Sequence, residues 1–457
     1  MLKPSVLKEL RSIVGLANVS TSPEELVVYS YDATQRESLP WAVVRPRSSQ
    51  EISEILKLAN RERFPVVPRG AGSGMSGGSV PVQGGVVLSL ERMKHILEID
   101  EQDFIAVVEP GVITADLQRE VESRGLFYPP DPSSNKFCTL GGNVAECAGG
   151  LRAVKYGVTK DYVLGLEVVL PTGEIITTGA RTVKSVAGYD LTKLIVGSEG
   201  TLGIATRITL KLLPLPETVR TLAAFFNEVP VAAKTASAIM ASGVLPRALE
   251  FVDQAALRAV EGFLKEDLSH DAAAMLLVEV DGPAESTARE ADRIAEIMMR
   301  SGAVRVNRAR SDSEREQLWK ARRAISPALY TIKPKKLNED IVVPRSRIAE
   351  SLQEIAAIAE RHGLLIVNFG HAGDGNIHTN IMYDEADLPK AETAVKEIFA
   401  ATLRLGGSIT GEHGIGLSKA AYLPMELGPE AISAMKRIKQ ALDPNNIMNP
   451  GKIFLGQ

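Results

Sequence analysis

Three of the chain's six histidines fall in two short motifs of the kind that can bind a metal ion. His371 and His378 flank the glycine-rich stretch Ala-Gly-Asp-Gly-Asn-Ile, and Glu412 and His413 are enclosed by two glycines. Apolar runs before and after the first motif predict two strands joined by a turn, so that its histidines can converge on one point. With Glu412 they would form a set of two imidazoles and a carboxylate, which suits a catalytic Zn, Mn or Fe ion with an open position. The alternative is a polar hairpin whose histidines only form hydrogen bonds, and the clustering favours the metal or catalytic site.

The overall composition excludes several classes of protein. A length of 457 residues predicts two or three domains. The formal net charge of −4 gives no electrostatic basis for binding nucleic acid or an anionic membrane surface. The N-terminus lacks the charged-then-apolar pattern of a signal peptide, and no apolar run approaches the ~18 residues that span a bilayer. We therefore expect a cytoplasmic protein, with peripheral attachment to a membrane through a partner left open.

The two cysteines, Cys138 and Cys147, do not have the spacing of a redox or metal motif. An iron–sulfur cluster usually takes four thiolates, so this chain cannot hold one alone. We expect both thiols to be small packing residues. If the protein moves electrons, they must enter or leave through another cofactor.

Residues 70–78 form a glycine-rich segment with five glycines and two serines. Residues 72–77 match the Gly-x-Gly-x-x-Gly pattern of nicotinamide-binding Rossmann folds. That fold needs a helix directly afterwards, but Pro81, Gly84 and Gly85 oppose a helix here. We therefore favour a loop whose exposed amides cradle phosphate over a Rossmann site or a flexible loop. A second backbone-rich surface of this kind is expected at residues 139–150.

The pattern of apolar residues predicts a change of architecture at Leu213-Pro-Leu-Pro216. Before this boundary, residues 3–30 are predicted to be helical with a second start at Pro23-Glu-Glu, and residues 163–178 are predicted to form a hairpin. Beyond it strands and helices alternate, which predicts an α+β domain with helices on one face of a sheet. The predicted strands are 218–226, 245–252, 274–280, 303–307 and 338–343, and the predicted helices are 230–242, 254–264, 284–301, 313–330 and 346–362.

Several motifs follow one another in a fixed order along the chain. They are Pro68-Arg-Gly-Ala-Gly-Ser-Gly, Leu140-Gly-Gly-Asn, Tyr156-Gly, Gly188-Tyr-Asp-Leu, Gly197-Ser-Glu-Gly-Thr-Leu-Gly, the two histidine motifs and Asn449-Pro-Gly-Lys. In these motifs the chain resembles the FAD-linked D-2-hydroxyacid dehydrogenases of the vanillyl-alcohol-oxidase fold. This family includes D-lactate dehydrogenase, the D subunit of glycolate oxidase and D-2-hydroxyglutarate dehydrogenase. The resemblance covers nearly the whole chain, from about residue 35 to the end.

The resemblance implies an α+β fold with two kinds of domain. A PCMH-type FAD-binding domain of two α/β subdomains is expected at residues 1–215. An α+β cap domain with an antiparallel sheet, which holds the substrate, is expected at residues 216–420. Residues 421–457 are expected to form a C-terminal segment that returns to the FAD domain.

The resemblance also assigns the FAD-binding residues. The first glycine loop would bind the pyrophosphate, and the second backbone-rich surface would contact flavin and ribityl. The residues concerned are Arg69, Gly70, Ala71, Gly72, Ser73, Gly74, Ser76, Pro132, Ser133, Thr139, Gly142, Asn143, Ala148, Gly149, Ile204 and Asn449. Cys147 departs from the family, because relatives often carry Asn there. No histidine occurs in residues 69–78, so we expect non-covalent FAD.

Oxidation of a 2-hydroxyacid requires a clamp for the carboxylate, a base for the hydroxyl proton and an acceptor for the α-hydride. The resemblance assigns the clamp to Arg322, since a guanidinium can bind a carboxylate through two parallel hydrogen bonds. Ser326, one helical turn later, and Asn380 are expected to contact the substrate as well. The hydride would pass to flavin N5.

The resemblance places a divalent metal, Zn or Mn (or Fe), on His371, His378 and Glu412. A divalent cation favours loss of the hydroxyl proton. His413 would be the general base and would also contact the substrate, because imidazole takes up a proton near neutral pH. Asp374 is expected to shape the turn rather than to bind metal.

The identity of the substrate is less strongly specified. Lys333, Lys335 and Lys336 could bind a second carboxylate, as in D-2-hydroxyglutarate, but such clusters are usually solvated. Asn338 stands near the position where hydroxyglutarate enzymes carry a lysine, which favours D-lactate or glycolate. Electrons are expected to leave to an electron-transfer flavoprotein, an iron–sulfur subunit or a quinone-linked partner, and a homodimer is compatible with the sequence. The competing functions are a flavin-free metal hydrolase, which leaves the glycine-rich half unexplained, and a non-catalytic flavoprotein subunit for electron transfer.

Overall fold

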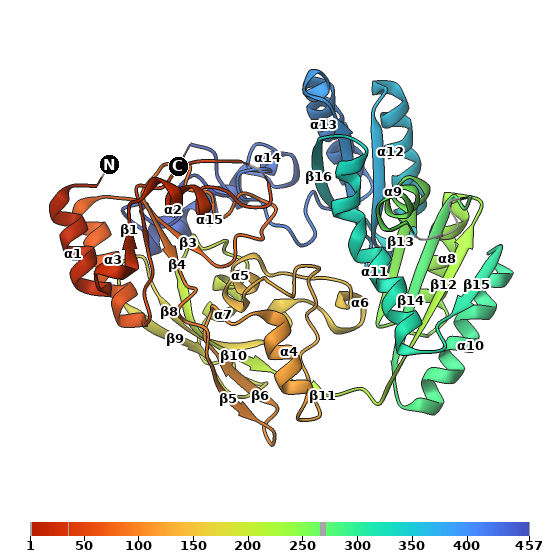
Figure 1. The fold of residues 1–457 in the computed structure, drawn as a ribbon, viewed down its shortest axis with the longest axis horizontal. Helices are drawn as coiled ribbons and strands as arrows, with labels where there is room; N and C mark the ends of the chain where they lie inside the picture. The colour runs from red at the N-terminus through yellow and green to blue at the C-terminus, as the bar shows by residue number, and fades with distance from the viewer. Residues whose placement is uncertain (1, 35, 266–270, 457) are drawn as a thin grey trace. The chain divides into compact units, whose positions relative to one another are not determined.

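The chain is shared between two structural units in the computed structural model, which describes residues 2–34, 36–265 and 271–456 (Figure 1). The first unit comprises Met1–Gly149, Val158–Leu215 and Glu412–Gln457. The second unit comprises Gly150–Gly157 and Pro216–Gly411. The domain boundaries drawn from the sequence stay a prediction.

A four-stranded sheet in the order β1-β2-β4-β3 begins the first unit. Strands β2, β4 and β3 run parallel, and helices α1 and α3 pack on the sheet through a core that includes Leu10, Ile52 and Val86. The bounds are α1 Pro4–Val14, β1 Val19–Ser20, α2 Pro23–Val28, β2 Ala42–Val44, α3 Ser49–Glu62, β3 Val66–Arg69 and β4 Val86–Ser89.

Residues 3–30 are not helical throughout, but the second helix start predicted at Pro23 is confirmed. Helix α1 ends at Val14, and Gly15 follows with a φ of +87°. Helix α2 starts afresh at Pro23, where the Ser22 hydroxyl accepts a hydrogen bond from the Glu25 amide (3.3 Å). The glycine and the Ser-Pro pair are signals for an end and a new start, and they outweigh the amphipathic pattern.

The glycine-rich segment after β3 leads into a strand and not into a helix. Strand β3 ends at Arg69, no helix occurs between residues 70 and 85, and β4 begins at Val86. This confirms the argument from Pro81 and the paired glycines against a Rossmann site.

A five-stranded antiparallel sheet in the order β5-β6-β10-β8-β9 completes the framework of the first unit. Strands β8 and β9 form the hairpin predicted for residues 163–178. The bounds are β5 Ile96–Asp100, β6 Ile105–Val108, α4 Thr114–Glu122, β7 Leu126–Phe127, α5 Leu140–Glu146, β8 Val163–Val169, β9 Ile175–Gly179, α7 Leu191–Ile195, β10 Ile204–Lys211, β11 Leu213–Pro214, α14 Leu423–Glu426 and α15 Pro429–Leu442.

The backbone-rich surface expected at residues 139–150 contains the short helix α5. The Thr139 hydroxyl caps this helix by accepting a hydrogen bond from the Gly142 amide (3.3 Å). The two glycines in its first turn have low helix propensity, so the sequence pattern did not predict this helix. The Asn143 side chain, in turn, donates to the Thr114 hydroxyl (2.7 Å) at the start of α4.

The second unit is built on a seven-stranded antiparallel sheet in the order β15-β12-β14-β13-β17-β18-β16 (Figure 1). This confirms the antiparallel cap sheet. Strands β12 to β15 come from the earlier part of this unit and strands β16 to β18 from the later part. The two groups are joined within the sheet by the pairing of β13 with β17. The bounds are β12 Thr218–Phe226, β13 Ala248–Asp253, β14 Ala274–Gly282, β15 Arg305–Arg308, β16 Lys335–Val342, β17 Leu365–His371 and β18 Asn376–Tyr383.

Helices pack on both faces of this sheet, and not on one face as the sequence suggested. Helices α9 and α11 pack on the face that carries Ala223, Phe225 and Leu277. Helices α8, α10 and α12 contact the same strands and one another, so they cover the alternate face. The bounds are α6 Ala153–Tyr156, α8 Val229–Ala241, α9 Gln254–Leu264, α10 Ala284–Arg300, α11 Asp312–Ala328, α12 Ile348–His362 and α13 Leu388–Arg404. Among the helices in the described residues, none is both long and apolar enough to span a bilayer.

Candidate active site

The first histidine motif forms the predicted hairpin of β17 and β18. The two strands are antiparallel, with His371 opposite Asn376 and Phe369 opposite His378. Asp374 lies in the turn, where its carboxylate accepts a hydrogen bond from the Asn376 amide (3.3 Å). This contact agrees with a role for Asp374 in shaping the turn.

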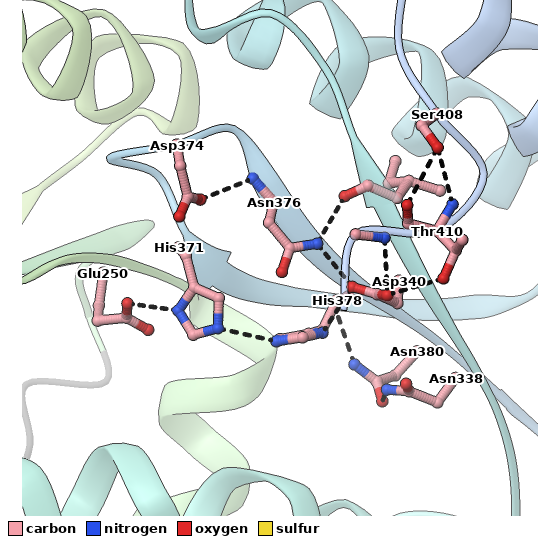
Figure 2. Close-up of polar contacts among 12 residues, drawn as sticks. Glu250, Asn338, Asp340, His371, Asp374, Asn376, His378, Asn380, Ser408 and Thr410 are labelled. Carbon is pink, nitrogen blue, oxygen red and sulfur yellow. Dashed lines mark hydrogen bonds and ion pairs between the residues drawn. The ribbon is translucent and has the colours of Figure 1, made fainter. Parts of the chain in front are cut away.

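The hairpin brings the two predicted metal ligands together. Both side chains are buried, and the Nε2 atoms of His371 and His378 lie 3.4 Å apart (Figure 2). Two imidazole nitrogens bound to one tetrahedral metal at the usual bond length are separated by about 3.3 Å. Without a cation, two imidazoles at this distance must share a proton, since two facing lone pairs repel. The arrangement therefore fits a divalent metal.

Glu250 on β13 is part of this site, although the sequence did not single it out. Its Oε1 lies 2.6 Å from Nδ1 of His371, the nitrogen that faces away from His378 (Figure 2). A carboxylate on the remote nitrogen fixes the ring and its tautomer, as in many metal sites. The available signal was a single glutamate in the apolar strand Ala248–Asp253.

Glu250 also holds Arg322, the predicted substrate clamp on α11. Its Oε2 accepts a hydrogen bond from Nε of Arg322 (2.8 Å) and lies 2.6 Å from Nη2. The guanidinium also lies over the Phe369 ring, 4.8 Å from its centroid. Burial works to raise the pKa of Glu250, but His371 and Arg322 outweigh it and lower that pKa below its usual value. An ionised Glu250 thus orients both the predicted clamp, Arg322, and a predicted metal ligand, His371.

We expect Glu250→Gln to weaken the binding of Zn²⁺ by about 10- to 100-fold, because His371 loses the carboxylate that fixes it. The free energy of unfolding should also fall by about 3–5 kcal/mol, because Arg322 loses its buried partner. Competition with a coloured chelator measures the first effect, and urea denaturation measures the second.

Glu279→Gln on the neighbouring strand is the matched control. Glu279 is also buried and paired, with Arg247 (3.2 Å) and the Trp319 indole (2.8 Å). It has no contact with either histidine among those the structure describes. It should lower stability and leave zinc affinity unchanged, and equal zinc affinities for all three proteins would contradict the role of Glu250.

Asp340 on β16 forms hydrogen bonds with the chain that leads into the second histidine motif. Its carboxylate accepts hydrogen bonds from the Asn376 amide group (2.6 Å), the Thr410 hydroxyl (3.2 Å) and the Gly411 backbone (2.9 Å) (Figure 2). These hydrogen bonds hold the backbone at Thr410 and Gly411, so Asp340 positions the chain there. Gly411 directly precedes Glu412, and no pattern in the sequence predicted this contact.

Glu412 and His413 belong to the first unit. There, the Glu412 carboxylate lies so close to Gly149 that a Cβ on this glycine would be 2.7 Å from Oε2. The predicted third metal ligand therefore adjoins the predicted flavin surface. Its approach to His371 and His378, and the role of His413 as base, stay predictions.

The other predicted substrate contacts have partners of their own. The buried Asn380 donates to the carbonyls of His378 (3.1 Å) and Val367 (3.3 Å), and its Oδ1 accepts from Asn338 (2.6 Å). The Ser326 hydroxyl accepts from Lys336 Nζ (2.8 Å). Asn380 shares a strand face with His378, so it is placed near the metal pair even though its role toward a substrate stays a prediction.

The predicted phosphate loop is shaped by close contacts in the first unit. The Arg69 guanidinium is buried and donates to the Tyr31 carbonyl (2.7 Å) and the Ser79 hydroxyl (3.2 Å). A Cβ on Gly72 would be 2.2 Å from Arg69 Nη2, and one on Gly70 would be 2.3 Å from the Thr139 hydroxyl. The loop thus packs against Arg69 and the start of α5. Because the Arg69 side chain supports the loop, we expect the loop backbone to contact the ligand.

The remaining residues assigned to FAD also lie in the first unit. Asn449 is buried with a φ of +45°, and its amide donates to the carbonyls of Gly78 (2.9 Å) and Glu199 (2.8 Å). Ile204 is buried at the start of β10, and both cysteines are free thiols whose pKa is raised, mainly by burial. Pro132, Ser133, Ala148 and Gly149 lie in loops around α5. Their contacts with the flavin stay predictions.

The fold is that of flavoproteins of the PCMH type. The solved structure of p-cresol methylhydroxylase with bound substrate superposes with a TM-score of 0.83 over 99% of this chain and 96% of the other, at 18% identity. Residues 40–179 match the FAD binding domain family, and residues 215–453 match the family of FAD linked oxidases, C-terminal domain.

Relatives of known name match the chain over its whole length. Glycolate oxidase subunit GlcD of Bacillus subtilis is 49% identical over 99% of this chain and 97% of its own. D-lactate dehydrogenase of Anaerostipes hadrus is 37% identical over 95% of this chain and 93% of its own. The chain belongs to the FAD-linked oxidase family, and it is an FAD-linked oxidoreductase.

Proposed function

We propose that the protein oxidises a D-2-hydroxyacid, D-lactate or glycolate, to the corresponding 2-oxoacid. The observation that carries the proposal is the buried line from Arg322 through Glu250 to His371, with His378 beside it. This line would set a carboxylate clamp next to a pair of metal ligands. The names of the relatives support the same substrates.

Arg322 would bind the substrate carboxylate. Nε and Nη2 face Glu250, which leaves the edge formed by Nη1 and Nη2 for a second carboxylate. Because Glu250 and the Phe369 ring hold the guanidinium, it loses little side-chain entropy when the substrate binds. Asn380 and Ser326 would complete the carboxylate end of the site.

His371, His378 and Glu412 would hold a divalent cation, which would supply electrostatic stabilisation of the deprotonated hydroxyl. His413, next to Glu412 in the chain, would take up the hydroxyl proton. FAD, held by the glycine loop of the first unit, supplies the acceptor for the hydride at N5. Asp340 would keep Gly411 in place and so restrict where Glu412 and His413 can lie.

Anaerobic stopped-flow mixing with D- and L-hydroxyacids tests this function. We expect yellow protein whose flavin band near 450 nm bleaches with D-lactate or glycolate, faster when Zn²⁺ or Mn²⁺ is added. L-lactate should be at least about tenfold slower, because the clamp and the metal pair fix the face that meets the flavin. A colourless protein that contains metal would favour the hydrolase, and flavin that no hydroxyacid reduces would favour a non-catalytic subunit.

Lys336 supports D-2-hydroxyglutarate as a second candidate substrate. Lys333 and Lys335 form ion pairs with Asp384 and Glu385, as expected of a solvated cluster. Lys336 instead points to Ser326, and burial lowers its pKa to about 8 with no acidic group contributing. It shares a strand face with Asn338, so a second carboxylate could meet it, and the same substrate screen decides between the two acids.

The electrons would leave to another protein. The relatives named glycolate oxidase subunit indicate a complex of several subunits. With two cysteines the chain cannot build an iron–sulfur cluster of its own, so we propose an iron–sulfur subunit, an electron-transfer flavoprotein or a quinone-linked partner as acceptor.

A further inference from the structure

Two carboxyl groups flank Gly414 in the first unit, that of the buried Glu199 and that of the half-buried Glu146, whose Oε2 is shielded from solvent. Glu146 is the last residue of α5, and Glu199 lies in the Gly-Ser-Glu-Gly turn after α7. A Cβ on Gly414 would lie 2.7 Å from Oε2 of Glu146 and 2.9 Å from Oε1 of Glu199. The two carboxyl groups thus face the same point of the return segment, which we define as residues 414–418.

Glu199 holds the backbone of the return segment. Its Oε1 accepts a hydrogen bond from the Ile415 amide (2.8 Å), and its Oε2 accepts one from the Gly416 amide (2.6 Å). The residue adopts a left-handed backbone with a φ of +53°, which is unfavourable for glutamate, and its own amide donates to the Ala145 carbonyl (2.8 Å). One donor on each oxygen is the arrangement expected of an ionised carboxylate.

Glu146 lies on the other side of Gly414. Its Oε1 lies 2.7 Å from where a Cβ on Gly78 would be, and its shielded Oε2 accepts no hydrogen bond from the residues that the structure describes. Two ionised carboxylates on either side of one glycine, with oxygens shielded from water, repel each other. Burial, then Glu199 and Asp32, raise the pKa of Glu146 well above its usual value, with the Ser76 hydroxyl as a weaker opposing contact.

The charges around the pair favour Glu199 as the ionised member. Burial raises the pKa of Glu199 as well, but the amides of Ile415 and Gly416, followed by Lys452 and Lys419, oppose this rise. Glu146 has no cation among the groups that act on it. A neutral Glu146 also suits its place next to a loop that would bind the doubly negative pyrophosphate of FAD.

We propose that Glu146 and Glu199 act as a positioning pair that carries one proton, which lies on Glu146. The ionised Glu199 fixes the return segment, and the neutral Glu146 avoids the repulsion of a second charge. The Ser76 carbonyl accepts from the Leu417 amide (2.7 Å), so the segment is fastened to the glycine loop as well. Ile415 is the second residue after His413. The pair therefore sets the position of the proposed base, and only this last step rests on the proposed function.

The pair gives stability a defined pH dependence. The folded protein binds the Glu146 proton more tightly than the unfolded chain, so the stabilisation from this group is fully present below the ordinary glutamate value of 4.5. This contribution declines as the pH rises toward the raised pKa of Glu146. Glu146→Gln keeps a neutral group of the same shape and should make the decline smaller.

Hydrogen exchange and thermal unfolding of the FAD-bound protein test the proposal. In Glu199→Gln, one of the two amides faces an NH₂ group, so exchange in residues 414–418 should become at least about tenfold faster. Glu146→Gln should keep the protection of the wild type and show a flatter fall of Tm as the pH rises above the ordinary glutamate value of 4.5. Unchanged exchange in Glu199→Gln, or an unchanged pH profile in Glu146→Gln, would overturn the pair.

Turnover separates this inference from the proposed function. Glu199→Gln should lower kcat about tenfold and leave KM nearly unchanged, because the base moves while the clamp stays in place. Should no hydroxyacid reduce the wild-type flavin, the proposed function fails, and the exchange and Tm measurements still decide on the pair. If Glu199→Gln does not fold, the pH profile of Glu146→Gln decides alone.

Discussion

Arg322→Lys is expected to lower kcat/KM for D-lactate or glycolate by about 10²- to 10³-fold. A lysine ammonium is a point charge on a flexible stem, and it cannot meet Oε2 of Glu250 with two nitrogens while it binds a substrate carboxylate through two parallel hydrogen bonds. The loss of one charge-assisted fork corresponds to about 3–4 kcal/mol. Most of the effect should appear in KM, with a smaller fall in kcat from a less well oriented α-hydrogen.

Arg323→Lys provides a control on the same helix turn. Arg323 is partly exposed and pairs with Glu316 on the surface of α11, so its replacement should leave the kinetics within about twofold of the wild type. Steady-state assays with an artificial electron acceptor measure both variants. Equal losses in the two proteins would show that the helix, and not the clamp, was damaged. An unaffected Arg322→Lys would remove Arg322 from the site.

The sequence predicted the second unit well because its elements have clear periods. Strands such as β12 and β14 are apolar runs bounded by turns, and α9 coincides with the predicted residues 254–264. The same method failed where glycine decided the backbone. Residues 3–30 carry a helical pattern broken at Gly15, and α5 forms in a glycine-rich stretch because Thr139 caps it.

The site could be predicted only as far as its residues are close in sequence. His371 and His378 meet because one hairpin carries both, and a turn rich in glycine announces a hairpin. Glu250 joins them only through the pairing of β13 with β17, and no local pattern specifies that pairing. Arg322 was found by resemblance, since a chain rich in arginines offers many candidates, and the structure supplies its physical reason through Glu250.

His378→Ala is expected to slow flavin reduction by about 10³-fold or more, the largest effect we foresee. The mutation would remove one of two imidazoles whose separation matches that of ligands on one cation. Loss of the cation forfeits several kcal/mol of stabilisation of the deprotonated hydroxyl. FAD content should not change, because the residues assigned to FAD lie in the first unit and His378 lies in the second. Stopped-flow reduction and metal analysis of the same preparation measure the two effects together.

His362→Ala and chelation show whether the effect belongs to the metal. His362 lies at the end of α12 and pairs with Glu397, so its loss should leave metal content and reduction unchanged. Treating the wild type with a chelator should reproduce the slow rate of His378→Ala, and added Zn²⁺ or Mn²⁺ should restore the wild type but not the variant. A chelated wild type that reduces its flavin at full speed would mean that His371 and His378 act through a shared proton. In that case Glu250, which fixes the His371 ring, would determine which of the two histidines donates that proton. It would not determine the geometry of a metal site.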